Sequence, residues 1–495
     1  MDKRIFNPLF LTIALIGGML THNNFADSVV GDIEFTNCKV SDPTGKLQVT
    51  AECAVFSVPE NYAQADAKKI DLHIARFKAK NEKDRESATT LLAGGPGQGA
   101  IESFVPNMLR LKKINTNQDI YLIDQRGTGK SNRMQCDTDN FDTTVEYDPE
   151  IVKEYTSKCL AGLPGDPRYY TTSVAMRDLD EIRKALGLEQ WNLYGGSYGT
   201  RTAQHYLKQY PNRVRSVILD GLVSPDRPLG PEIALESQRA LDDLLKRCSN
   251  DTDCSNAFPE LEKNVRDLID ELKQESRQVT IENMVTGKKE DLLFTSAHLA
   301  GGIRMALYSP ITMSILPNLL YEAAVNQHYG PLARQSINQT RQIADLMSMG
   351  MHNSVLCTED ADKFDDVQID MSKLENSYLG KDFFDAMKLT CDIWPRGEID
   401  EGFHELVTTD KPVLLLSGSV DPVTPPAYAE QAMQNMRNSN HIVLEGQGHI
   451  QMAVGCMPTI LAKFIEQASF EEIETECLNK VKPEPFFIDF NGPTP

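Results

Sequence analysis

Ser197 stands in the setting of an activated nucleophile. It is the centre of Gly195–Gly199, which reads Gly-Gly-Ser-Tyr-Gly and matches the pattern Gly-x-Ser-x-Gly. The apolar run Trp191–Tyr194 precedes it and the amphipathic segment Thr202–Tyr210 follows, so we expect a turn from a strand into a helix. Side chains two residues before and after the serine would clash in so tight a turn, which explains the glycines. The pattern predicts acyl transfer at an exposed serine oxygen, against the alternative of a plain glycine-rich loop.

A base and a carboxylate that could orient it follow the serine along the chain. Asp421 comes after the apolar run Val413–Leu416, and His449 comes after Ile442–Leu444. The helical segment Ala427–Met436 fits between these strands, and the order Ser, Asp, His is the one that such a nucleophile turn uses. The alternatives are a loop histidine bonded to local carbonyls and an aspartate that only shapes an Asp-Pro turn. We predict a catalytic triad of the serine, Asp421 and His449.

Two backbone N–H groups are needed to stabilise the oxyanion that forms during acyl transfer. We expect one from Tyr198, the residue after the nucleophile, and one from Gly95 in the glycine-rich run Gly94–Gly99, which follows the strand Thr89–Ala93. A phosphate or dinucleotide loop is the alternative, but Gly-x-Gly-x-x-Gly is not present there. This chemistry requires no metal and no organic cofactor.

The elements that must position these residues are predicted from hydrophobic patterning. Short apolar runs typical of buried parallel strands alternate with helical segments such as Met176–Leu186. This alternation predicts an α/β fold with a mostly parallel sheet flanked by helices. The charged segment Lys78–Glu86 is interpreted as a hairpin loop between two strands. The expected strands are Val55–Pro59, Ile70–Ala75, Thr89–Ala93, Ile120–Ile123, Trp191–Tyr194, Val217–Leu219, Val413–Leu416 and Ile442–Leu444.

The pattern changes over residues 226–405, where apolar residues recur at helical spacing and strand-like runs become rare. We predict a mainly helical cap inserted before the catalytic aspartate, between a first core part at 27–225 and a second at 406–495. Such a cap would lie over the strand ends, where open α/β sheets bind ligands.

Residues 1–26 differ from the rest of the chain. A basic start, an apolar stretch from Ile5 to Leu20 and a polar end are typical of a secretory signal peptide, with cleavage expected near Ala26. The alternative is a membrane anchor, for which the apolar stretch is short. We predict an exported protein, periplasmic or secreted, with no stable membrane insertion after cleavage.

The net charge of the chain disfavours some classes of binding partner. Fifty Lys and Arg against 71 Asp and Glu leave a formal charge of −21, which repels phosphate backbones. Nucleic acid and anionic membrane surfaces are therefore not expected as partners.

The ten cysteines fit an oxidising compartment, because their number is even and no pair has metal-ligand spacing. Spacing does not decide connectivity, and buried free thiols are the alternative for some of them. Pairing of sequence neighbours gives five short loops: Cys38–Cys53, Cys136–Cys159, Cys248–Cys254, Cys357–Cys391 and Cys456–Cys477.

Four ordered motifs together resemble one family. Gly94–Gly97, Asp124–Ser131, Gly195–Gly199 and the Asp421 loop with the later histidine look like the signatures of the prolyl aminopeptidase and tripeptidyl aminopeptidase family of α/β-hydrolases. The resemblance spans about Pro59 to Lys463. Two cap segments, Val355–Glu359 and Cys391–Pro395, are similar to those of its exported, tripeptidyl-type branch. The residue before Gly94, often histidine in the family, is Ala93 here, which puts the shape of the oxyanion loop in question.

The resemblance implies the α/β-hydrolase fold and a peptidase that acts on free N-termini, with peptides as its substrates. Such an enzyme needs an acidic group for the substrate ammonium, and our candidates are Glu359 and its neighbour Asp360, with Asp220 as a further possibility. A solvated acidic loop is the alternative for the first two. Asp124 and Arg126 are expected to order a loop rather than to contact substrate.

Two other functions remain open at this point. A secreted carboxylesterase would use the same triad, and a non-catalytic exported binding protein could retain the same fold. The intact serine, aspartate and histidine disfavour the second.

Overall fold

The computed structural model describes residues 27–81, 86–136, 147–230, 232–283, 286–367 and 369–493. The expected signal peptide lies outside these residues. No helix of the described residues is long and apolar enough to cross a bilayer.

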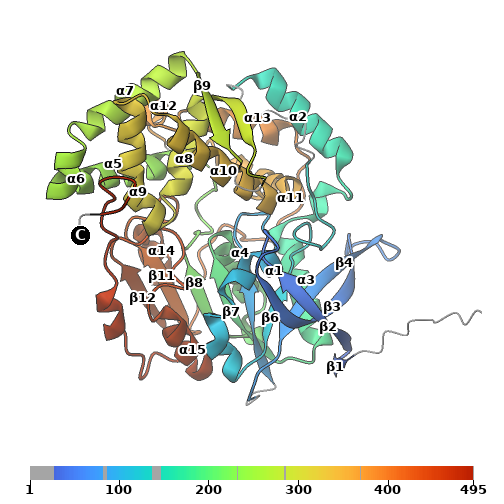
Figure 1. Cartoon of the computed structure of the whole chain (residues 1–495). Coiled ribbons are helices and arrows are strands. Elements are labelled where there is room, and N and C mark those ends of the chain that lie inside the picture. The colour runs from blue at the N-terminus through green and yellow to red at the C-terminus, as the bar shows by residue number, and fades with distance from the viewer. Residues whose placement is uncertain are drawn as a thin grey trace, which may run out of the picture.

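One large twisted sheet forms the centre of the described chain (Figure 1). Six of its strands run parallel and every predicted apolar run is part of a strand, which confirms the mostly parallel α/β arrangement. Four further strands add an antiparallel part at one side, of which the first two were not predicted. In spatial order the strands are β1 (Ser28–Val30), β2 (Ile33–Ser41), β3 (Gln48–Pro59), β4 (Lys69–Phe77), β6 (Ile120–Ile123), β5 (Ser87–Leu92), β7 (Gln190–Gly196), β8 (Val214–Asp220), β11 (Val413–Gly418) and β12 (Ser439–Leu444).

The interpretation of Lys78–Glu86 as a hairpin loop is wrong. Strands β4 and β5 flank this segment but do not pair, because β6 lies between them, antiparallel to β4 and parallel to β5. All six residues of β5 are buried, as is typical of a central strand covered on both faces. A charged connection between two strands therefore did not indicate that the strands are neighbours.

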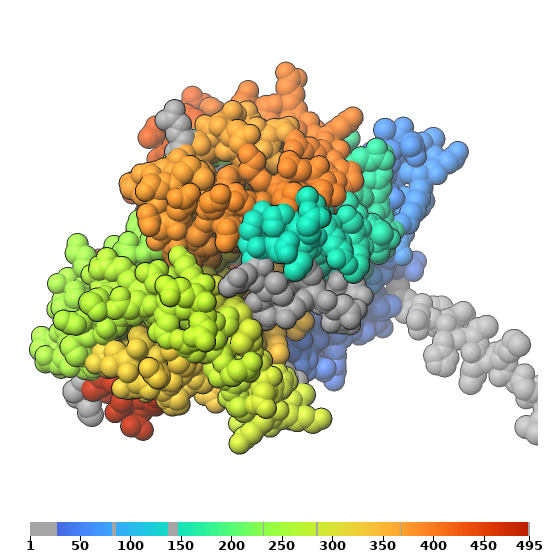
Figure 2. Space-filling model, turned by 90° about the horizontal axis from the view of Figure 1, so that it is seen from above, coloured from blue at the N-terminus to red at the C-terminus, as the bar shows by residue number. Residues whose placement is uncertain are grey.

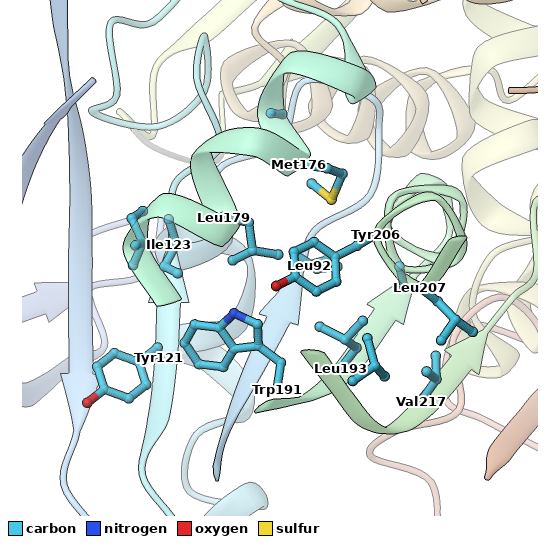
Figure 3. Close-up of a cluster of buried hydrophobic side chains, with 14 of the residues drawn as sticks. Leu92, Tyr121, Ile123, Met176, Leu179, Trp191, Leu193, Tyr206, Leu207 and Val217 are labelled. Carbon is cyan, nitrogen blue, oxygen red and sulfur yellow. The ribbon is translucent and has the colours of Figure 1, made fainter. Parts of the chain in front are cut away.

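Helices cover both faces of the sheet and build a core on each. One face carries α3 (Thr172–Ala185), α4 (Tyr198–Gln209) and α14 (Pro426–Ala432), and the other carries α1 (Ala100–Phe104) and α15 (Met457–Gln467). Figure 3 shows how the first core is organised: Trp191 of β7 lies among Leu179 and Met176 of α3 and Tyr206 of α4. Burial of such large apolar side chains fixes β7, and with it the turn that follows β7, against the two helices.

The chain between β8 and β11 is mainly helical, as predicted, with one short hairpin. Figure 1 shows its helices packed together on one side of the sheet. Its elements are α5 (Ile233–Asn250), α6 (Thr252–Ala257), α7 (Leu261–Gln274), β9 (Arg277–Glu282), β10 (Lys289–Phe294), α8 (Ser296–Ala306), α9 (Pro310–Ala324), α10 (Gly330–Leu346), α11 (Met349–Val355), α12 (Met371–Asn376) and α13 (Asp382–Ile393). We call this segment the insertion.

One helix from the first half of the chain lies with the insertion. Helix α2 (Pro149–Gly162) precedes β7 in sequence, yet Figures 1 and 2 show it beside α13. Cys159 of α2 belongs to a buried apolar cluster that also holds Phe384 and Trp394 of the insertion. The surface above the sheet is therefore made by two separate parts of the chain.

All five disulfides expected from pairing sequence neighbours are present, and no cysteine of the described residues is free. They fit a protein that matures outside the reducing cytoplasm.

The disulfides should differ in their effect on stability. Opening Cys357–Cys391, whose cysteines are 34 residues apart, by a double serine substitution should lower the free energy of unfolding by about 4 kcal/mol, because a long loop restricts the unfolded chain most. Opening Cys248–Cys254, with a separation of 6, should cost about 2 kcal/mol. Urea unfolding followed by circular dichroism measures both, and equal losses would contradict the loop-length argument.

Candidate active site

Ser197 forms the sharp turn between β7 and α4 that the sequence predicts. Its backbone has φ 55° and ψ −125°, a conformation that residues other than glycine rarely adopt. A Cβ on Gly195 would collide with the carbonyl of Gly199, and one on Gly199 would collide with the carbonyl of Leu92. Gly195 is therefore required by close packing within the turn, and Gly199 by close packing of the turn against β5. The Ser197 N–H donates to the Asp220 carbonyl at 2.9 Å, which ties the turn to the end of β8.

Asp421 and His449 meet on the loops after β11 and β12. The imidazole Nδ1 lies 2.7 Å from Asp421 Oδ2. The other carboxylate oxygen accepts the backbone N–H groups of Val423 and Thr424, both at 2.9 Å, and the Thr424 hydroxyl donates to Oδ2 at 2.8 Å. The carboxylate is fully buried and is held in one orientation, so it fixes both the position and the tautomer of the imidazole.

The electrostatics of this pair suit a general base. Burial by itself would raise the pKa of Asp421 and lower the pKa of His449, because burial disfavours a charge. Their mutual attraction and hydrogen bond outweigh burial, so the pKa of Asp421 is lowered and the pKa of His449 is raised. The imidazole can therefore take a proton more readily than a free histidine.

The loop that carries His449 lies close to Ser197, and the second ring nitrogen of the histidine, Nε2, is free to form a hydrogen bond. The ring carbon Cε1 lies 2.8 Å from where a Cβ on Gly221 would stand, and Ile450 Cδ1 lies 3.4 Å from the corresponding point at Gly196. These contacts bring the histidine loop against the ends of β7 and β8, beside Ser197. Nε2 is buried and has no hydrogen-bond partner among the described residues, so the serine and the imidazole are not bonded to each other in this state. Such bonds are often long in enzymes without substrate.

The two expected oxyanion donors lie next to the nucleophile. A Cβ on Gly94 would stand 3.0 Å from the Ser197 Cβ, so the glycine-rich loop passes directly over the serine. Gly95 has φ 109°, a conformation that favours glycine. Within the described residues, neither the Gly95 N–H nor the Tyr198 N–H donates to a protein acceptor. Both groups can therefore serve a developing negative charge.

The insertion is hydrogen-bonded to the loops that carry the predicted triad and oxyanion residues, and sequence reasoning missed these contacts. The Tyr308 carbonyl accepts the His449 N–H at 2.9 Å, and the two rings pack edge to face with centroids 5.1 Å apart. Arg239 of α5 donates to the Asp421 carbonyl at 2.7 Å. Ser348 donates its N–H to the Gly97 carbonyl of the oxyanion loop at 2.9 Å. No local pattern in the sequence indicates these contacts, because each joins segments far apart in the chain.

The two acidic residues proposed for the substrate amine have different surroundings. Asp360 is fully buried and bonded to Arg201 at 2.7 and 2.9 Å, so an internal cation already balances its charge. Glu359 accepts the N–H and the hydroxyl of Thr172 at 2.6 and 2.9 Å. Burial raises the pKa of Glu359 to about 8. The Thr172 hydroxyl also bonds the Tyr198 hydroxyl at 2.5 Å, which connects Glu359 to the residue after the nucleophile.

Three other predicted polar residues have internal roles. Asp220 accepts the N–H groups of Gln451 and Met452, each at 2.8 Å, so it anchors the loop that carries His449. Burial raises the pKa of Asp220 to about 6.

Asp124 and Arg126 order their own loop, as expected. The Asp124 carboxylate accepts backbone N–H groups, and Arg126 is buried in a two-bond pair with Asp178. Among the described residues, no group of three or more His, Cys, Asp or Glu side chains could hold a metal ion.

Comparisons with known proteins agree with this architecture. A family model described as the alpha/beta hydrolase fold matches residues 91–247, and one described as TAP-like protein matches residues 376–477. The chain is an α/β hydrolase.

Similar proteins narrow the class. The serine protease Hip1 of Mycobacterium tuberculosis is 27% identical over 465 residues, which cover 86% of this chain and 86% of the relative. Tripeptidyl aminopeptidase of Streptomyces lividans is 29% identical over 194 residues, 36% of each chain. A crystal structure of proline iminopeptidase from Mycobacterium smegmatis aligns with a TM-score of 0.40 and 13% identity, over 84% of this chain and 98% of that one. The family models and the named relatives support a serine hydrolase with the α/β-hydrolase fold, similar to serine peptidases.

Proposed function

We propose that this protein is an exported aminopeptidase that hydrolyses peptides from their free N-terminus with Ser197 as its nucleophile. The observation that carries the proposal is the buried Asp421–His449 pair. Its second imidazole nitrogen has no hydrogen-bond partner among the described residues, and its loop packs against the strand end beside the strained turn at Ser197. The similarity to a tripeptidyl aminopeptidase supports the peptide substrate, and the five disulfides support export.

In the proposed mechanism His449 removes the proton of Ser197 as the serine oxygen attacks the scissile carbonyl. Asp421 holds the imidazole and stabilises the imidazolium, while the N–H groups of Gly95 and Tyr198 donate to the oxyanion. The imidazolium then gives its proton to the leaving amine, and the acyl-enzyme forms. In the second half of the reaction His449 takes a proton from water as the water attacks the ester, and it returns the proton to the serine oxygen. The N-terminal fragment is then released.

Glu359 is the proposed anchor for the substrate ammonium. Its carboxylate has capacity for a further donor beyond the two bonds from Thr172. A pKa near 8 is close to that of a peptide α-amino group, so one proton can be shared between the two groups around that pH. Asp360 is proposed to hold Arg201 beside this anchor rather than to bind the amine itself.

Substitution of Glu359 by glutamine should raise KM for peptides with free N-termini by about tenfold to a hundredfold, with a smaller change in kcat, because a neutral amide cannot pair with ammonium. Because the Glu359 carboxyl has a pKa of about 8, the change in KM that its ionisation causes around that pH should disappear in the variant. Peptides with free and acetylated N-termini, cleaved in parallel and identified by mass spectrometry, measure the effect. The wild type should cut only the free form.

Glu102 supplies a matched control. It is a half-buried glutamate of α1, near the oxyanion loop, whereas Glu359 is buried. Burial raises the pKa of Glu102 as well, and its Oε1 has no partner among the described residues. Glu102→Gln should leave the preference for free N-termini in place. If Glu102→Gln abolishes that preference and Glu359→Gln does not, the anchor is Glu102.

A secreted carboxylesterase is the second candidate, because the same triad cleaves esters. Hydrolysis of a short acyl ester that depends on Ser197, together with intact free and acetylated peptides, would favour it over the peptidase.

A further inference from the structure

Arg304 is an arginine of the insertion whose charge has no carboxylate partner in the part of the chain that the structure describes. It lies half-buried in α8 and forms no ion pair or hydrogen bond with any described residue, although acidic residues outnumber basic ones in the chain. Its Nε is buried without an acceptor. Its guanidinium carbon lies over the ring of Phe383, 5.4 Å from the ring centroid. A partly desolvated guanidinium without an anion is costly unless another molecule supplies one.

The position of Arg304 is beside the catalytic base. Tyr308 follows it by about one helical turn, and Tyr308 is the residue whose carbonyl and ring contact His449. The positive charge of Arg304 also acts to lower the pKa of His449 and of His352. His352 approaches the Pro96 carbonyl of the oxyanion loop at 3.1 Å. Arg304 is therefore within electrostatic reach of both catalytic loops.

The order of the strands in the sheet indicates on which side of the scissile bond Arg304 lies. His449 follows β12 and must deliver its proton to the leaving amine, so the leaving group lies on the side of β8, β11 and β12. Glu359 is bonded to the start of α3, which packs over β6 and β7 on the other side of Ser197. An acidic and a cationic group thus flank the proposed nucleophile in opposite directions.

We propose that Arg304 binds a carboxylate of the substrate on the leaving-group side, so that the enzyme prefers short peptides whose free C-terminal carboxylate follows closely after the scissile bond. This inference rests on the proposed function, because it assumes that the amine end lies toward Glu359. It adds a specificity residue: the substrate is recognised by both of its charged ends. A guanidinium suits this role because its N–H groups match a carboxylate in two parallel hydrogen bonds.

The test uses the mature protein and pairs of short peptides of increasing length, each with a free N-terminus and made as the C-terminal acid and as the C-terminal amide. For the shortest cleavable peptide, kcat/KM should be about tenfold or more higher for the acid than for the amide. The ratio should fall toward one as the peptide lengthens, because the carboxylate moves beyond reach of Arg304. It should also fall as salt is added.

Variants assign the preference to the side chain. Arg304→Gln should bring the acid-to-amide ratio close to one, Arg304→Glu should invert it, and Arg304→Lys should retain part of it. Arg341→Gln is the control, because Arg341 is an exposed arginine of α10 that is paired with Glu290. Melting temperatures of all four variants show whether they remain folded.

The possible results distinguish failure of the inference about Arg304 from failure of the proposed function. A wild-type ratio near one, or a ratio that Arg304→Gln leaves at the wild-type value, would overturn the inference and leave the aminopeptidase proposal standing. Absence of cleavage of both peptides by the wild type would overturn the proposed function together with the inference.

Discussion

Replacing Ser197 by alanine should lower kcat/KM for peptide hydrolysis by at least about 10⁴-fold while the protein remains folded. The substitution removes only the oxygen that attacks the carbonyl, and alanine keeps the Cβ that packs near Gly94. Residual activity should come from binding and from the oxyanion N–H groups alone. Mass spectrometry of peptide fragments measures the rate. Labelling by a serine-directed phosphonate should add one adduct to the wild type and none to the variant.

A second Ser–His–Asp cluster supplies the control for this experiment. Ser173 Oγ lies 3.3 Å from His205 Nε2, and Asp400 Oδ2 lies 2.8 Å from the same nitrogen. Because both partners use one nitrogen, the imidazole cannot relay between a nucleophile and an orienting carboxylate. Ser173→Ala should therefore keep most of the activity. If Ser173→Ala abolishes labelling and Ser197→Ala does not, the nucleophile has been assigned to the wrong serine.

The sequence predicted those parts of the site that are set by local geometry. Glycine is required at Gly195 and Gly199 because backbone atoms occupy the space of a side chain, and such a requirement is visible in any single sequence. Asp421 and His449 follow buried apolar strands, so periodicity and order along the chain were sufficient to place them near the serine. The five disulfides joined sequence neighbours, which is the simplest connectivity.

Contacts between distant segments were not predictable. Helix α2 packs with α13 through a shared apolar cluster, and its own pattern does not indicate a partner. The same is true of Tyr308 and Arg239, which hold the loops of His449 and Asp421 through backbone carbonyls. A bond that uses a carbonyl leaves no trace in residue type at the accepting position. The bonds of Asp220 were hidden for a related reason: its carboxylate accepts the backbone N–H groups of Gln451 and Met452, which no residue type in the sequence indicates.

These contacts change the role of the insertion. A cap that only covered the site could open without affecting the triad. Here the insertion supplies hydrogen bonds to the base loop, to the loop of the orienting acid and to the oxyanion loop. Movement of the insertion would therefore displace the residues of the proposed triad, and under that proposal it would couple substrate selection to catalysis.

Asp421→Asn should lower kcat/KM by about 10³-fold to 10⁴-fold, the second largest effect expected here. The amide is nearly the same size, so packing is preserved, but it can no longer stabilise the imidazolium or hold the Nδ1 proton. The pH profile should change as well. His449 acts as a base only when neutral, and its pKa is raised mainly by Asp421, so wild-type activity is lost as pH falls through that raised pKa. Without the carboxylate the pKa falls, and the residual activity should persist to lower pH.

Asp220→Asn is the matched control for this variant. Asp220 and Asp421 are both fully buried aspartates at the ends of neighbouring strands, and both raise the pKa of His449. Only Asp421 touches the imidazole, whereas Asp220 binds the backbone of Gln451 and Met452. We expect Asp220→Asn to cost about tenfold and to shift the acid limb in the same direction by less. Stopped assays across pH with both variants separate the two roles. If the two substitutions cost the same activity and move the acid limb equally, then Asp421 orients the base no more directly than Asp220 does, and the proposed triad would be incorrect.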